Sequence, residues 1–383
     1  MFEIVEKEVT GTVIKVIGVG GAGGNAVDHM IRAGVEGVEF ICCNTDAQAL
    51  KRTQAKIKLQ LGTSGLGAGA KPDAGRIAAQ NDRERIAEAL DGAHMVFITA
   101  GMGGGTGTGA APVVAEIAHE NGILTVAVVT KPFRFEGKRM KVAEAGLDEL
   151  SQHVDALIVI LNERLMEVLG DDVSVQEAFM AADNVLHNAV AGIAEIINNP
   201  GMVNVDFEDV HTVMQEIGMA MMGSGSASGI DRARIAAEQA VASPLLEGIS
   251  LSGARGVLVN ITASRSLKMK EVDEVMETIH HFADTDATVI FGAVYNDDIG
   301  DDLRVTVVAT GLGPARAQMQ AKPLSVVAQK TGTDNMPVSR PPNFKELDTP
   351  AVWRNNRTDQ LEAMKQSGMD PMDIPAFLRK QAD

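Results

Sequence analysis

Short apolar runs alternate with amphipathic segments through the first 170 residues of the chain. The first run, residues 13–19, is interrupted only by Lys15 and Gly18 and is rich in β-branched residues, which is typical of a strand buried on both faces. Strands of this kind that alternate with helical patterns predict a parallel sheet covered by helices on both sides, a Rossmann-like α/β fold. The predicted strands are residues 13–19, 38–43, 95–100, 123–130 and 156–161.

Glycine-rich turns follow two of these strands. Residues 20–25 lead from the first strand into a helix, and residues 103–109, Gly-Gly-Gly-Thr-Gly-Thr-Gly, lead from a later strand into another. Glycine lets a backbone close tightly around a ligand, and the unpaired N–H groups of a helix start favour an anion. A flexible linker is the alternative, but linkers do not lie between a buried strand and a helix start. We therefore predict a phosphate-binding cradle at the carboxyl ends of the strands, with residues 65–70 as a third glycine-rich segment around one triphosphate.

The second half of the chain begins with a long amphipathic helical pattern at 174–199, which Asn198-Asn199-Pro200-Gly201 ends. Shorter segments follow it and predict a smaller α+β domain. These are helices at 207–217, 231–242 and 271–283, and strands at 255–262, 287–294 and 303–310.

The composition changes near Gly313-Pro314. Residues 314–370 are rich in Pro, Gln, Ser, Asn and Thr without periodicity, which predicts a disordered tether. At its end, Ile374, Phe377 and Leu378 would share one face of a helix. A frayed tail and a partner-binding peptide are both compatible with this pattern.

Bulk charge narrows the function. The net charge of −17 and the pI near 4.9 argue against a general binder of nucleic acid or membrane surfaces. They also imply that a bound polyphosphate would need Mg²⁺ or another cation beside it. The two cysteines, Cys42 and Cys43, are adjacent within a predicted strand, which indicates buried thiols in a reducing cytoplasm. We see no signal peptide, no membrane-spanning run and no histidine at a metal-ligand spacing.

One alternative follows from the first glycine loop alone. Residues 18–23 fit G-x-G-x-x-G, and Asp46 lies beyond the next strand where a ribose-binding acid would be expected, which suggests an NAD-dependent oxidoreductase. The pattern is weak because overlapping glycine registers satisfy it, and residues 103–109 are not part of it. The G-x-x-x-x-G-K-[ST] pattern of P-loop enzymes does not occur.

Together, the glycine signature, a later carboxylate segment and the closing peptide resemble the FtsZ family of bacterial cell-division GTPases, relatives of tubulin. The resemblance runs from about residue 11 to 313 and resumes at 373–378. It implies a Rossmann-like GTPase domain followed by a smaller α+β domain. The implied segments are an N-terminal arm (1–10), a GTP-binding domain (11–173), a central helix (174–200), a catalytic loop and following helix (201–222), a C-terminal α+β domain (223–313), a disordered linker (314–370) and a partner-binding peptide (371–383).

The resemblance also implies the roles of individual residues. The first loop and the signature loop would hold the phosphates, Ala70 would lie near the γ-phosphate, and Glu136 and Arg139 would contact the ribose and phosphate side. Asn162 and Asp183 would bind the guanine edge, with Phe179 packing on the base; for Phe179 alone, core packing is the alternative. The loop residues are Gly21, Ala22, Gly23, Gly24 and Asn25, and Gly104, Gly105, Thr106, Gly107, Thr108 and Gly109.

Asp206 and Asp209 are the candidate hydrolytic residues. Their spacing of three places them on one face of a starting helix, where capping of that helix is the alternative role. The central helix would span roughly 35–40 Å at 1.5 Å per residue, so the pair is expected at the opposite pole of the subunit. In the family, the matching aspartates act on the nucleotide of the next subunit, so that hydrolysis needs a head-to-tail contact that yields open filaments.

The resemblance therefore implies a cytoplasmic GTPase that binds GTP and GDP with Mg²⁺ and builds the division ring at midcell from single protofilaments. The terminal peptide, Asp373 to Lys380, would bind division proteins, membrane tethers and spatial inhibitors, without direct membrane insertion. The rival hypotheses are the NAD-dependent oxidoreductase and a scaffold that binds nucleotide without cleaving it.

Overall fold

The computed structural model describes residues 11–312, apart from 171, 199–202, 204, 217, 244–252 and 285. The predicted arm at 1–10, linker at 314–370 and terminal peptide at 371–383 lie outside the described residues. So does the Pro200-Gly201 end of the central helix.

A parallel sheet forms the first half of the chain, as the alternating pattern predicts. Its strands lie in the order β3-β2-β1-β4-β5-β6 and every neighbouring pair is parallel. Sequence analysis missed only the short β3. The strands are β1 (Ile14–Val19), β2 (Val38–Asn44), β3 (Ile57–Gln60), β4 (Met95–Gly101), β5 (Leu124–Lys131) and β6 (Ala156–Leu161).

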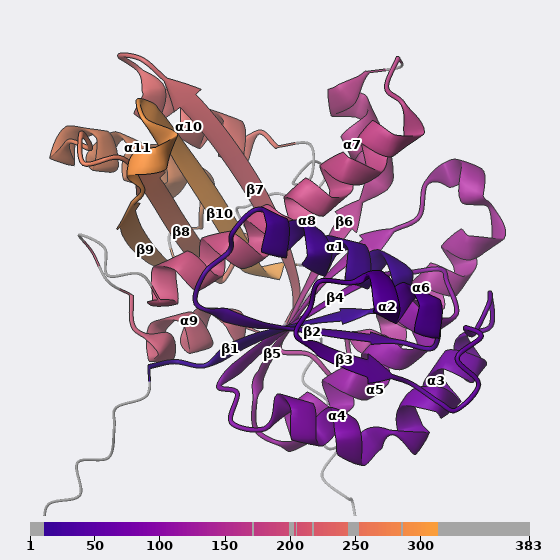
Figure 1. Ribbon diagram of the computed structural model, residues 1–383. Coiled ribbons are helices and arrows are strands. Elements are labelled where there is room, and N and C mark those ends of the chain that lie inside the picture. Colours follow the sequence, from indigo (N-terminus) through magenta and orange to yellow (C-terminus); the bar gives the residue numbers. More distant parts are fainter. Residues whose placement is uncertain are drawn as a thin grey trace, which may run out of the picture. The chain divides into compact units, whose positions relative to one another are not determined.

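Helices cover both faces of this sheet (Figure 1). On one face α1 (Gly20–Arg32) and α8 (Val175–Asn198) bury Met30 and Leu186 against β1, β4 and β5. On the other face α5 (Thr106–Glu120) is buried along most of its length. The remaining helices of this half are α2 (Ala47–Arg52), α3 (Pro72–Asn81), α4 (Arg83–Leu90), the 3₁₀ turn η1 (Arg134–Glu136), α6 (Lys138–Leu150) and α7 (Asn162–Leu169).

The central helix α8 begins at a capping box. The Ser174 hydroxyl accepts a hydrogen bond from the Glu177 N–H (3.2 Å), and the Glu177 carboxylate accepts from the Ser174 N–H (2.9 Å). These contacts satisfy N–H groups that have no partner within the helix. The helix α9 (Phe207–Met214) follows and ends three residues earlier than the pattern predicts.

The second half is a smaller α+β unit, also as predicted. Its strands lie in the order β7-β10-β8-β9, with β10 antiparallel to β7 and β8 and with β8 parallel to β9. It joins the first sheet where β6 pairs with β7 over two positions, Leu157 with Met219 and Ile158 with Ala220. The elements are β7 (Met219–Ser228), α10 (Arg232–Val241), β8 (Gly256–Ala263), α11 (Met269–Phe282), β9 (Thr288–Tyr295), the 3₁₀ turn η4 (Asp297–Ile299) and β10 (Asp302–Leu312).

The strand β7 is the largest difference from the sequence-based expectation. The resemblance implies a loop and following helix up to residue 222, whereas β7 begins at Met219 and continues through a run of Gly, Ser and Ala. A Cβ on Gly225 would lie 2.2 Å from the Ala236 carbonyl oxygen, because α10 packs directly on this strand. Close helix packing requires small residues here, and small residues look like a loop in the sequence.

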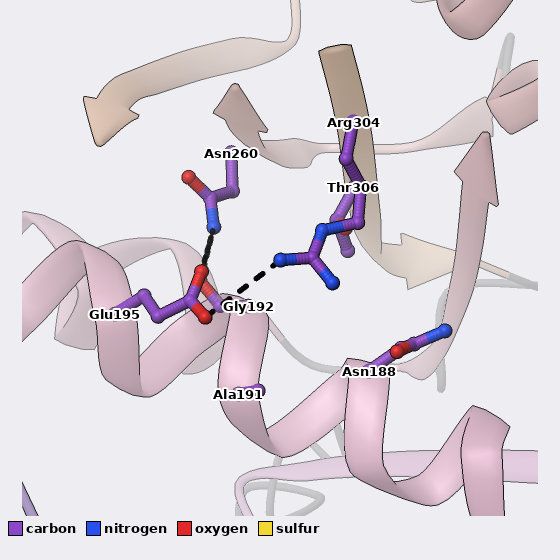
Figure 2. A pocket seen from close by; sticks show the side chains of 7 residues that line it. All are labelled: Asn188, Ala191, Gly192, Glu195, Asn260, Arg304 and Thr306. Atoms are coloured by element: carbon purple, nitrogen blue, oxygen red, sulfur yellow. Dashed lines mark hydrogen bonds and ion pairs between the residues drawn. The ribbon is translucent and has the colours of Figure 1, made fainter. Parts of the chain in front are cut away.

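A polar contact joins α8 to the second unit (Figure 2). Asn260 on β8 donates through Nδ2 to the Gly192 carbonyl (3.0 Å), and Arg304 on β10 forms an ion pair with Glu195 (3.9 Å). The central helix therefore contacts both sheets, and it carries residues of the candidate site near its start.

Candidate nucleotide site

Two helix starts meet at the carboxyl edge of the parallel sheet. The helix α1 starts at Gly20 directly after β1, and α5 starts at Thr106 after β4, the neighbouring strand. A Cβ on Gly20 would lie 2.9 Å from the Gly107 nitrogen, so the two starts are in close contact. The chain leaves β1 toward β2 and leaves β4 toward β5, in opposite directions along the sheet. This is the switch point where sheets of this kind bind ligands, and both helix starts present N–H groups to it.

The glycines of the two loops fall into two groups. Gly21, Gly24 and Gly104 have open space where a Cβ would lie. A Cβ on Gly23 would lie 2.2 Å from the Thr99 carbonyl oxygen, and one on Gly109 would lie 1.9 Å from that of Pro72. The first group leaves room for a ligand, whereas the second is required by packing against β4 and α3.

The remaining residues of the two loops are either tightly packed or exposed. Gly105 and Gly107 belong with the tightly packed group, since their Cβ atoms would lie 2.4 Å from the Gly69 oxygen and 2.5 Å from the Gly101 oxygen. The Thr108 hydroxyl accepts a hydrogen bond from the Gly103 N–H (2.8 Å) and so braces the turn of the loop. Ala22 and Asn25 are exposed on the first turns of α1.

The third glycine segment, residues 65–70, lies against the signature loop, residues 103–109. The Gly105 N–H donates to the Gly69 carbonyl (3.0 Å), and the adjacent Ala70 is exposed. Thr45, which sequence reasoning missed, lies in the same place, because its hydroxyl is 2.6 Å from that of Thr106. The signal that could have found it is the Asn-Thr-Asp sequence directly after a predicted strand.

A cavity of about 140 Å³ runs along α1 on the side of β2. Gly21 and Gly24 line it together with the polar side chains of Asn25, Asp28 and Asn44. The structure therefore has open, polar space directly in front of the first glycine loop.

Glu136 and Arg139 follow β5, the next strand along the edge. Arg139 donates through Nη1 to Glu136 Oε2 (2.7 Å), and Glu136 Oε1 accepts from the Phe133 N–H (3.1 Å). The two side chains are thus brought together and oriented by the turn between β5 and α6, with Arg139 exposed.

Asn162, Phe179 and Asp183 lie beyond the end of β6. Asn162 begins α7 and is buried, and its Oδ1 has no hydrogen-bond partner. Phe179 and Asp183 come from the first turns of α8, where Phe179 is 46% exposed and lies edge-on to Phe133 at 5.4 Å between ring centroids. The exposed aromatic surface of Phe179 and the unsatisfied amide oxygen of Asn162 each fit a planar, hydrogen-bonding ligand.

Asp183 has a perturbed carboxyl group. Burial raises its pKa to about 6, and the nearby positive charges of His29 and Arg32 on α1 lower it in part. A carboxylate held in a partly desolvated position is prepared to accept hydrogen bonds from a ligand.

Asp206 and Asp209 lie at the other end of the sheet. They enclose Phe207 and Glu208 in the sequence. The ring centroid of Phe207 lies 6.2 Å from that of His94, the residue before β4. Figure 1 shows α9 beside the start of β1. The glycine loops follow the carboxyl ends of these strands, and β4 alone spans about 23 Å at 3.3 Å per residue. The structure therefore does not bring the two aspartates together with the phosphate loops of the same chain.

Asp46, the acid of the dinucleotide fingerprint, has a local role. Its Oδ1 accepts hydrogen bonds from the N–H groups of Gln48 (2.8 Å) and Ala49 (3.4 Å), so it caps α2. In the part of the chain that the structure describes, no three or more His, Cys, Asp and Glu side chains are grouped to hold a metal ion. Within the same residues, no helix combines the length and apolar character needed to cross a membrane.

Two family models match the chain. The model of the Tubulin/FtsZ family GTPase domain matches residues 13–170, and that of the FtsZ family C-terminal domain matches residues 218–313. These ranges coincide with the parallel sheet and the smaller unit. Neither model is that of an oxidoreductase, and nothing in the comparisons supports the NAD-dependent alternative.

Known proteins resemble the chain along its whole length. It is 55% identical to the "Cell division protein FtsZ" of Pseudomonas aeruginosa and to that of Pseudomonas putida, over 100% of both chains in each case. Among solved structures, "FtsZ dimer, empty" of M. jannaschii matches with a TM-score of 0.76 and 44% identity, covering 82% of this chain and 90% of that one.

Proposed function

The chain belongs to the FtsZ family of tubulin-related GTPases, and we propose that its hydrolytic site is shared between two copies arranged head to tail. Membership makes it a cytoskeletal GTPase of cell division that binds GTP and GDP and assembles with itself.

The nucleotide would lie along the carboxyl edge of the parallel sheet. Backbone N–H groups at the starts of α1 and α5 would hold the phosphates, with Ala70 beside the γ-phosphate. Glu136 and Arg139 would exchange part of their mutual ion pair for the ribose and phosphate. Asn162 and Asp183 would bind the guanine edge and Phe179 its face, because guanine presents adjacent N–H donors that a carboxylate matches and adenine does not.

Mg²⁺ would accompany the phosphates. The residues of the two phosphate loops, 20–25 and 103–109, include no Lys or Arg, so charge compensation by a metal ion fits this donor set. Asp46 follows Thr45, which contacts Thr106 at the start of α5, and its carboxylate would help to hold the ion. When bound, the ion would supply positive charge that compensates the phosphates.

The separation of Asp206 and Asp209 from the phosphate loops carries the shared-site proposal. Phosphoryl transfer to water needs a group that orients the attacking water, and exposed carboxylates can do this. The aspartates are at the start of the strands and the phosphates at their ends, so a carboxylate of one copy reaches the nucleotide of the next. Such a contact uses two different surfaces and propagates into a filament.

The cellular role follows from filament formation. Filaments would form a ring at midcell on the inner face of the membrane, and hydrolysis would weaken the contact between copies and drive turnover. The terminal peptide at 373–380 would bind membrane tethers and other division proteins.

A mixing experiment tests the shared site. Asp209→Ala removes the acid, and Asp183→Ala removes the guanine contact on a different surface. Each variant alone should release little phosphate, whereas an equal mixture should recover up to about one quarter of wild-type turnover, the share of contacts with both functional halves. A mixture no more active than the sum of its parts would contradict the proposal. As a control, wild-type turnover per molecule should rise with protein concentration.

A further inference from the structure

Two threonine hydroxyls connect the end of β2 with the start of α5. Thr45 Oγ1 and Thr106 Oγ1 are 2.6 Å apart, a short distance for an O–H···O hydrogen bond. Thr45 is only 4% exposed, whereas Thr106 is partly accessible as the first residue of α5. One hydroxyl of the pair thus belongs to a buried side chain, and the other to a partly accessible side chain at the helix start where the candidate phosphate site lies.

Backbone hydrogen bonds also attach the glycine segment at 65–70 to Thr45 and to the loop at 103–109. The Thr45 carbonyl accepts from the Gly67 N–H (3.0 Å), and the Gly105 N–H donates to the Gly69 carbonyl (3.0 Å). A Cβ on Gly105 would lie only 2.4 Å from that oxygen, so the two loops are in close contact. Thr45 therefore has a fixed position from which to orient the Thr106 hydroxyl.

The sheet order indicates which phosphate this hydroxyl would meet. The base-binding residues follow β6, the ribose-binding pair follows β5, and the phosphate loops follow β4 and β1. Thr45 follows β2, the next strand in the same direction. A nucleotide extended along this edge has its terminal phosphate at the end nearest Thr45.

We propose that Thr45 is a positioning residue that lets the site distinguish GTP from GDP, an inference that rests on the proposed nucleotide site. A phosphate oxygen only accepts hydrogen bonds, so the Thr106 hydroxyl must be the hydrogen-bond donor to the phosphate. The Thr106 oxygen then accepts a hydrogen bond from the Thr45 hydroxyl. This hydrogen bond keeps the Thr106 O–H directed toward the γ-phosphate. With GDP this acceptor is absent, and the orientation of the pair contributes little to binding.

Matched substitutions test the inference. Thr45→Val keeps the side-chain shape and removes the hydroxyl, whereas Thr45→Ser keeps the hydroxyl and removes a methyl group. Equilibrium titration of purified protein with GTP and with GDP, without turnover, gives the two affinities. Loss of one orienting hydrogen bond should weaken GTP binding of Thr45→Val about five- to tenfold, with GDP binding changed less than about twofold. Thr45→Ser should keep the wild-type ratio of the two affinities.

A second pair of variants tests the inference if Thr45→Val does not fold. Thr45→Cys and Thr45→Ser have nearly the same shape, but a thiol is a weak donor, so Thr45→Cys should lose GTP preference and Thr45→Ser should not. In a Thr106→Val background, Thr45→Ser and Thr45→Cys should bind GTP equally. Equal weakening of GTP and GDP, or equal effects of Ser and Cys in the wild-type background, would overturn the inference. A wild-type protein that binds neither nucleotide would instead overturn the proposed site itself.

Discussion

The Asp206 carboxylate accepts a hydrogen bond from the backbone N–H of Asp209 at 2.9 Å. Asp206 is therefore the N-cap of α9, as the capping alternative predicts. Both carboxylates are exposed, and capping uses one oxygen of Asp206 only. The two aspartates are thus not equivalent: a substitution of Asp206 changes helix stability as well as any chemistry, whereas a substitution of Asp209 leaves the cap in place.

Asp209→Ala should therefore separate hydrolysis from folding and binding. Turnover of GTP should fall at least about 100-fold because a group that orients water is lost, while GTP affinity stays within about twofold. Glu208→Ala is the matched control, since it removes the same charge from the preceding position of the same helix turn. Phosphate release and nucleotide titration measure both. Equal loss of binding and turnover in Asp209→Ala would contradict a role in the neighbouring copy's site.

Asp183→Asn should change the preferred base. An amide can donate to the O2 atom of xanthine, but it cannot accept two hydrogen bonds from guanine as a carboxylate does. GTP affinity should fall about 100-fold and XTP affinity should rise above that of the wild type. Competition titrations with both nucleotides measure the switch, and Asp148→Asn, on the exposed side of α6, is the control. An unchanged GTP to XTP ratio would argue against contact of Asp183 with the base.

The raised pKa of Asp183 predicts opposite pH effects on binding and on stability. The pKa is about 6 in the folded chain against an ordinary 3.8, so the folded state binds the proton more tightly between these values. Stability without nucleotide should then rise as pH falls through about 6 toward 4, and this contribution is lost as pH rises. GTP affinity should fall over the same range, because the carboxylate that accepts the guanine protons is neutralised.

Asp183→Asn isolates this group from its neighbours. His29 and Arg32 lie near the carboxyl, and His187, whose ring contacts that of His29, has a pKa lowered mainly by burial. Denaturant unfolding and GTP titration at several pH values, with and without the substitution, measure the difference. If both proteins show the same pH dependence, Asp183 is not the titrating group.

Two neighbouring glycines of the first loop should respond differently to alanine. Gly23→Ala places a Cβ 2.2 Å from the Thr99 carbonyl oxygen, so it should reduce the free energy of unfolding by about 1–3 kcal/mol. Gly24→Ala meets open space within α1 and should leave stability unchanged or raise it by about 0.5–1 kcal/mol. It should nevertheless weaken GTP binding if phosphates lie on this turn. Urea unfolding and GTP titration of both variants provide the check.

Arg232 should be the most costly charge to remove from the smaller unit. It is 6% exposed and donates to both oxygens of Glu271 (2.7 and 3.1 Å) and to the Asp301 carbonyl (2.7 Å). Arg232→Met leaves the Glu271 carboxylate without its partner and should destabilise the protein by about 3–5 kcal/mol. Arg234→Met breaks an exposed pair with Glu238 and should cost less than about 0.5 kcal/mol. If thermal unfolding shows that both substitutions destabilise the protein by similar amounts, the buried ion pair does not contribute more stability than the exposed one.

The sequence alone predicts the elements whose cause is local. The apolar runs that become β1, β2, β4, β5 and β6 are recognisable because a strand buried on both faces must be apolar at most positions. The glycine loops that follow β1 and β4 are recognisable for a similar reason, since their composition has few other uses between a strand and a helix.

Tertiary contacts decided the rest. Sequence could not tell Gly23, which packs on β4, from Gly24, which faces open space, because the two differ only in what lies beside them. The strand β7 was hidden because α10 packs so closely that only small residues fit. Thr45 acquires a role through a hydroxyl 61 positions away, at Thr106. Pairing, packing and distance depend on which segments meet in space, and no local pattern encodes that.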